Sequence, residues 1–171
     1  MMEFLSRLEQ LPFFMWVLQS GSIWAYPTIL TVHTVGMGIV AGLTAIICLR
    51  LLGMAPALPI KPLEKLLPII WWSFGINALT GTTLLIADAT TKLTNYDFYI
   101  KMVFILVGVL VLRSMRTKVF ADPQLDKAPV TSAAKGLAWL SLLSWAGAIT
   151  AGRLLAYLGP VSGGAQGLTN R

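Results

Sequence analysis

Four apolar stretches, each long enough to cross a bilayer, recur along this chain of 171 residues. A spanning helix needs about 20 predominantly apolar residues, and the stretches at about 25–52, 68–88, 98–116 and 136–159 reach that length. Only 12% of the residues are charged, against about 25% in soluble domains. Too few polar side chains remain to cover a surface that faces water. The pattern therefore predicts an all-α fold, a bundle of four transmembrane helices.

Proline, glycine and charge mark the ends of these stretches. Pro27 opens the first stretch and Gly53 follows it, in agreement with the usual places of proline and glycine at helix ends. The third stretch is the weakest, because Lys101 and Arg113 leave a short uncharged centre and must extend towards the membrane surfaces. Pro160 ends the fourth stretch, and we expect a flexible tail at 160–171.

The first 20 residues differ from the four stretches. Their head is acidic, and Pro12 breaks a short apolar part rich in aromatic residues, which does not suit a signal peptide. We expect an interfacial helix at about 4–20 that lies among the lipid headgroups, with Trp16 as its anchor. A partial fifth span is the alternative. The whole chain, 1–171, is then a single integral membrane domain.

The distribution of basic residues predicts the orientation. Eight basic residues fall in or beside the first-to-second and third-to-fourth connections: Arg50, Lys61, Lys65, Arg113, Arg116, Lys118, Lys127 and Lys135. Five fall on the other side: Arg7, Lys92, Lys101, Arg153 and Arg171. The positive-inside rule places the eight in the cytoplasm and both termini outside.

The same distribution argues against a nucleic-acid partner, although the net charge is +6. The basic residues stand at the ends of apolar runs and do not form one polar face. The sequence also has no recognisable arrangement of nucleophile and base, no phosphate-binding glycine loop and no metal-ligand spacing. We therefore assign no catalytic residues and do not expect an enzyme.

His33 is the only histidine, and it lies inside the first apolar stretch. Six residues separate it from Pro27, a depth of about 9 Å. Arg153 lies six residues before the end of the fourth stretch, and Asp88 ends the second on the same outer side. Ionisable residues within a membrane usually face the protein interior and have a partner. We expect these three residues to form a polar layer in the outer half of the membrane.

Helical spacing adds three neighbours to this layer. Gly36 shares a face with His33, Asn77 with Asp88, and Tyr157 with Arg153. If the three faces converge, they form a polar pocket that opens outward. Simpler structural roles remain open at every position.

Close helix packing would explain Gly36, together with Gly38 and Gly42, because small residues let backbones approach. An interhelical hydrogen bond would explain Asn77. His33 would be satisfied by a carbonyl or by a threonine such as Thr31 or Thr34. Asp88 and Arg153 would form an ion pair with each other or reach the lipid headgroups.

Haem b binding is the sharpest hypothesis for this pocket. Imidazole is a common axial ligand of haem iron, Gly36 one turn from His33 leaves space for a flat macrocycle, and Arg153 would pair with a propionate. The second axial ligand would be Met102 or His33 of another subunit, or the iron would be five-coordinate. A quinone pocket, and a path for protons or solutes, are the other uses we consider.

Several segments together resemble an uncharacterised family of small four-helix proteins of the bacterial inner membrane: 24–42, 49–53, 95–101 and 152–157, with Asp88. The resemblance implies four transmembrane helices and no established activity. A histidine common in that family near the cytoplasmic end of the third helix is absent here, where 113–116 reads Arg-Ser-Met-Arg. The pattern His-x-x-Gly is also similar, more weakly, to helices of cytochrome b561-like and copper-resistance membrane proteins.

Our leading functional hypothesis is a non-catalytic membrane subunit that carries haem b at His33 and exchanges electrons with a periplasmic partner or a quinone. The alternative is a transport, sensing or assembly protein whose pocket is an ion-paired polar layer. Either protein would work as a homo-oligomer or within a larger membrane complex.

Overall fold

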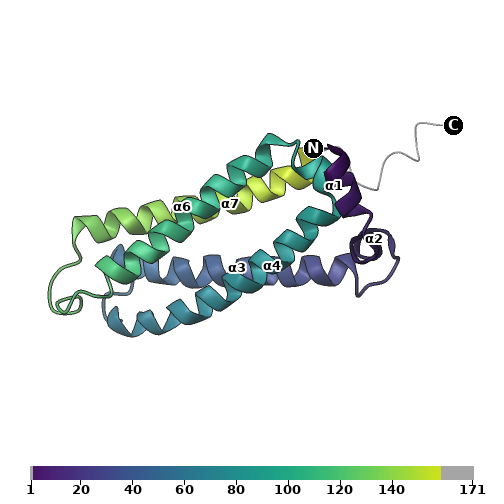
Figure 1. Cartoon of the computed structure of the whole chain (residues 1–171). Coiled ribbons are helices and arrows are strands. Elements are labelled where there is room, and N and C mark those ends of the chain that lie inside the picture. The colour runs from purple at the N-terminus through teal and green to yellow at the C-terminus, as the bar shows by residue number, and fades with distance from the viewer. Residues whose placement is uncertain (1, 159–171) are drawn as a thin grey trace.

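The computed structural model describes residues 2–158, and within them every regular element is a helix. In chain order these are α1 (Met2–Glu9), α2 (Pro12–Gln19), α3 (Tyr26–Leu51), η1 (Lys61–Lys65), α4 (Leu66–Ala87), α5 (Ala89–Lys92), α6 (Tyr96–Lys118) and α7 (Ser132–Leu158). The long helices form two antiparallel pairs, α3 with α4 and α6 with α7, and α7 joins the pairs by packing on α3 (Figure 1). The all-α helical bundle is confirmed.

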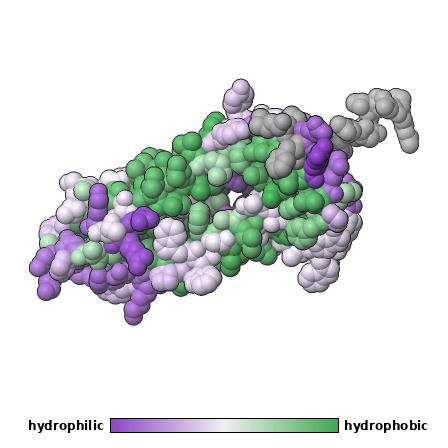
Figure 2. All heavy atoms as spheres, in the orientation of Figure 1, coloured by the Kyte–Doolittle hydropathy of each residue, from purple (hydrophilic) through white to green (hydrophobic). Residues whose placement is uncertain are grey.

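Three helical stretches are long and apolar enough to cross a membrane: Tyr26–Leu51, Lys61–Ala87 and Tyr96–Lys118. Apolar residues dominate the middle of the molecule, and hydrophilic residues gather at its two ends (Figure 2). The chain is therefore a multi-pass membrane protein by its architecture. The fourth helix, α7, has 27 residues and lies along α6 and α3, and its role as a fourth span stays a prediction.

The apolar core is concentrated at the end of the bundle that carries the loops before η1 and after α6. Ile47, Leu51 and Phe120 are fully buried there, with Met115 beside them. Asp126, from the loop between α6 and α7, fastens this end. Its carboxylate accepts the backbone N–H groups of Ile60 at 2.6 Å and Lys61 at 2.9 Å.

Reciprocal contacts between glycines and aromatic rings hold α6 against α7. A Cβ added at Gly147 would lie 2.6 Å from the ring of Phe104, and one added at Gly108 would lie 3.1 Å from the ring of Trp145. Each helix thus offers a glycine to a ring of the other. The sequence predicts small residues at helix contacts in general, but it did not single out this pair of contacts.

The N-terminal segment differs from the expected single helix at 4–20. It forms two helices, α1 and α2, that meet at Leu11, whose backbone is extended (φ −61°, ψ 137°). Pro12 causes the break, because proline disfavours a helical conformation in the preceding residue and suits the first turn of a new helix. Both short helices contact α4, at the end of the bundle away from the apolar core (Figure 1).

Candidate functional site

His33 and Asn77 fasten α3 to α4 by exchanging hydrogen bonds. The Asn77 side-chain Nδ2 donates to the backbone carbonyl of His33 at 2.5 Å, and the His33 Nδ1 lies 3.1 Å from the backbone carbonyl of Asn77. The hydroxyl of Thr80 lies 3.2 Å from the same Nδ1. Each residue therefore satisfies a polar group of the other inside an apolar bundle. This exchange confirms the interhelical hydrogen bond expected for Asn77.

The threonines of α3 are not partners of His33, contrary to the pairing considered from the sequence. The hydroxyl of Thr31 donates to the carbonyl of Pro27, and that of Thr34 donates to the carbonyl of Leu30. Such bonds to the preceding turn are the usual way for a helical threonine to satisfy itself. The partners of His33 come from α4 instead.

Two glycines allow this close approach. A Cβ at Gly36 would lie 3.3 Å from Asn77 Nδ2, and a Cβ at Gly81 would lie 2.8 Å from His33 Cε1. The packing role expected for Gly36 is therefore present, and Asn77 occupies the space beside Gly36 that the sequence left to a haem macrocycle. Gly38 and Gly42 are exposed and have no neighbour within 4 Å of an added Cβ, so they do not pack against the described residues.

The hydrogen bond to Asn77 defines the chemistry of the imidazole. A carbonyl oxygen only accepts, so this bond requires a proton on Nδ1. In the neutral ring Nε2 then carries a lone pair, available to a metal or a proton. A ring held through Nδ1–H by a backbone carbonyl is the arrangement in which histidine commonly ligates metals.

Two lysines lie near this ring, at the end of the bundle that carries α1 and α2. His33 is within electrostatic range of Lys101 and Lys92. The stem of Lys101 lies on α7, where a Cβ at Gly152 would be 3.6 Å from its Cε. We expected Lys101 to extend outward to the membrane surface, whereas it is partly buried between α6 and α7.

Lys92 is tied to the end of α4. Its ammonium donates to the carbonyl of Leu84 at 2.8 Å and lies 3.8 Å from Asp88 Oδ2. Burial lowers the pKa of Lys92, and the charge of Asp88 opposes that shift. Asp88 thus pairs with Lys92, four residues away, and not with Arg153 as the sequence suggested.

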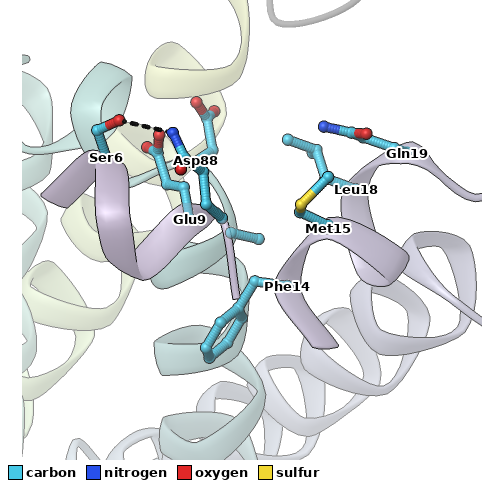
Figure 3. A pocket seen from close by; sticks show the side chains of 9 residues that line it. Ser6, Glu9, Phe14, Met15, Leu18, Gln19 and Asp88 are labelled. Atoms are coloured by element: carbon cyan, nitrogen blue, oxygen red, sulfur yellow. Dashed lines mark hydrogen bonds between the residues drawn. The ribbon is translucent and has the colours of Figure 1, made fainter. Parts of the chain in front are cut away.

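Asp88 also lines a small pocket beneath the N-terminal helices (Figure 3). The pocket has a volume of about 170 Å³ and lies between α1, α2 and the end of α4. Glu9 also lines the pocket, and its Oε1 accepts the backbone N–H and the hydroxyl of Thr90, at 2.7 and 2.8 Å. These bonds attach α1 to α5.

Arg153 does not join the layer. Its side chain is exposed, and no ion pair links it to another residue among 2–158. By helical spacing Trp145 and Ile149 lie on the same face of α7 as Arg153, but Trp145 is 3% exposed while Ile149 is 42% exposed. The side chain of Tyr157 lies outside the described residues.

The structure therefore brings His33, Gly36 and Asn77 together, and places Asp88 at the same end of the bundle. Thr80 and Lys92 belong with them and were missed from the sequence. Thr80 lies three residues after Asn77, so helical spacing alone could have placed it on the same face.

Comparison of the chain with family models, with curated proteins and with solved structures found no match. Within the described part of the chain, no group of three or more His, Cys, Asp or Glu side chains is placed to hold a metal ion. Function must therefore be inferred from the site alone.

Proposed function

We propose that this membrane protein is a non-catalytic subunit that binds haem b in the outer half of the bundle, with Nε2 of His33 as an axial ligand. The observation that carries the proposal is the bond from Nδ1 to the carbonyl of Asn77 at 3.1 Å. It orients the ring and leaves Nε2 to ligate iron, and the protein would then exchange electrons with a periplasmic partner or a quinone.

The charge near the ring supports an anionic cofactor. Haem b carries two propionates, and the ammonium of Lys101 is in electrostatic range of His33. Burying an ammonium is costly unless the group is paired. Lys101 therefore replaces Arg153 as the proposed propionate partner, because Arg153 is exposed.

The residues present limit how iron would be coordinated. Met102 is 45% exposed and is a poor second ligand for iron bound to His33. Five-coordinate iron, or a second ligand from His33 of another copy, remains consistent with the single histidine. The two cases differ in oligomeric state, since only the second requires a dimer.

An absorption spectrum of the protein purified from haem-supplied cells tests the proposal. We expect a Soret band that His33→Ala abolishes and that Gly38→Ala retains, because Gly38 is on the same helix with no neighbour near an added Cβ. Lys101→Met should retain the band and weaken haem retention. Absence of the band in the unmodified protein, or an unchanged band in His33→Ala, would exclude the proposal.

The partly buried pair of Asp88 and Lys92 favours a second candidate, a transport or assembly protein. Intramembrane and interfacial ionisable residues often mark paths for ions. Proton or solute flux into vesicles that contain the purified protein, lost in Asp88→Asn and retained in Gly38→Ala, would support transport. Flux that does not depend on Asp88 would argue against it.

A further inference from the structure

The contact between α3 and α7 contains buried polar groups that lack a hydrogen-bond partner. Among the described residues these include the hydroxyls of Thr44 and Ser141 and the indole Nε1 of Trp145. Thr44 and Ser141 are 0% exposed, and Trp145 is 3% exposed. Buried polar groups in proteins are nearly always bonded, either to protein or to an ordered water. Three unbonded groups on neighbouring turns of α3 and α7 therefore call for an explanation.

The register of the two helices brings these groups to one place. The thiol of Cys48 faces the hydroxyl of Ser141 across the contact. The geometry of this pair does not make a hydrogen bond, so Ser141 Oγ has no partner. The helices run in opposite directions (Figure 1), so Thr44, one turn from Cys48, is level with Trp145. Trp145 follows Ser141 by one turn of α7, so the two share a face, and the indole ring also packs against Gly108 of α6.

We infer that a water molecule is bound between α3 and α7 and is shared by Thr44, Ser141 and Trp145. The indole N–H only donates, so the water oxygen accepts from it. The two water hydrogens are then donated to Thr44 Oγ1 and Ser141 Oγ. Three hydrogen bonds are typical of a buried water.

This site is separate from the His33 site. Thr44 lies eleven residues beyond His33 along α3, which is about 16 Å of helix. Apolar side chains of the core, including Val40, come between them. Loss of haem binding would therefore leave the proposed water in place.

Ser144 provides a matched control on the same helix. It is 2% exposed, like the residues of the proposed site. Its hydroxyl donates to the carbonyl of Leu140 at 2.7 Å, so it does not need a water. Replacing Ser144 removes a buried hydroxyl without touching the proposed water.

A double-mutant cycle in the purified full-length protein tests the inference. Thr44→Val and Ser141→Ala each remove a partner of the same water, so we expect their effects on the unfolding equilibrium constant to be coupled by about fivefold. The cycle of Thr44→Val with Ser144→Ala should be additive within about twofold. Equal, additive behaviour of both cycles would mean that each hydroxyl bonds a carbonyl of its own helix, and it would overturn the inference.

A crystal structure of the unmodified protein provides a second test that needs no variant. We expect ordered density within hydrogen-bond distance of Thr44 Oγ1, Ser141 Oγ and Trp145 Nε1. A well-resolved contact without such density, or with the hydroxyls turned onto their own backbone, would contradict the shared water.

Discussion

At the scale of the residue, the position of His33 depends on Gly81, which has no side chain and so leaves room for the imidazole ring. The ring lies against Gly81, where a Cβ would come within 2.8 Å of Cε1. The backbone of Gly81 belongs to α4 and the ring of His33 belongs to α3, so neither can move without loosening the contact between these helices. The glycine therefore sets the orientation of the imidazole as much as its hydrogen bonds do.

Gly81→Ala should therefore displace the ring and destabilise the protein by about 1–3 kcal/mol, the usual effect of overpacking. Gly75→Ala on the same helix is the control, since Gly75 is exposed and has no neighbour within 4 Å of an added Cβ. It should be neutral or stabilising, because alanine favours helix over glycine. Equilibrium unfolding in detergent measures both. Equal stability of the two variants would show that the ring tolerates the added methyl group.

Asn77 and Gly36 could be predicted at this scale, whereas the partners of Asp88 and Arg153 could not. A polar amide in an apolar helix has few ways to be satisfied, and a bond to a neighbouring helix is the commonest. Charges near a membrane surface have water and headgroups as further partners. The depth of a residue within a predicted span therefore could not show that Asp88 pairs with Lys92 and that Arg153 is exposed.

At the scale of the element, α6 and α7 interlock because each ring occupies the place of a missing side chain. Gly147→Ala would bring a Cβ to 2.6 Å from Phe104, and we expect a loss of about 1–3 kcal/mol. Adding Phe104→Leu should restore part of that loss, because the smaller side chain makes room for the methyl group. Unfolding of the two variants checks this, and a double variant less stable than Gly147→Ala alone would contradict the interlock.

The loop between α6 and α7 should make stability depend on acid pH. Hydrogen bonds from the backbone N–H groups of Ile60 and Lys61 hold the pKa of Asp126 below its ordinary value of 3.8. A lowered folded-state pKa stabilises the protein fully above the unfolded value, and this stabilisation is lost as the pH falls through the folded value.

We therefore expect the unfolding midpoint of the unmodified protein to fall more between pH 6 and about pH 3 than that of Asp126→Asn. Asp122→Asn is the matched control. Asp122 bonds only the N–H of Gln124 within its own loop, so this variant should keep the full pH dependence. If Asp126→Asn kept the full pH dependence as well, the hydrogen bonds from Ile60 and Lys61 would not be the source of that dependence.

The positions of the long helices could be predicted well from the sequence, whereas the contacts between the helices could not. Proline and glycine placed α3 within a few residues of Tyr26–Leu51, and the apolar runs located α4 and α6. The break at Pro12 was visible, yet its division of the N-terminal helix was underestimated. The contacts between helix faces depend on aromatic rings and glycines that are far apart in the chain. The apolar periodicity of one helix does not predict such contacts.

At the scale of the whole molecule, the two ends of the bundle differ. One end carries the apolar core and the loop that Asp126 fastens. The other carries α1, α2 and α5 with the pair of Asp88 and Lys92. The eight basic residues near the first end would hold it in the cytoplasm by the positive-inside rule, and the His33 site would then lie towards the periplasm.

Labelling of single cysteines tests this orientation in bacterial cells. Cys48 is the only native cysteine, so Cys48→Ala provides a background without thiols. Thr94→Cys, exposed between α5 and α6, should react with a membrane-impermeant thiol reagent in intact cells. Lys127→Cys, exposed between α6 and α7, should react only after the inner membrane is permeabilised. The reverse pattern would place His33 towards the cytoplasm, where a periplasmic electron partner could not reach a haem bound to it.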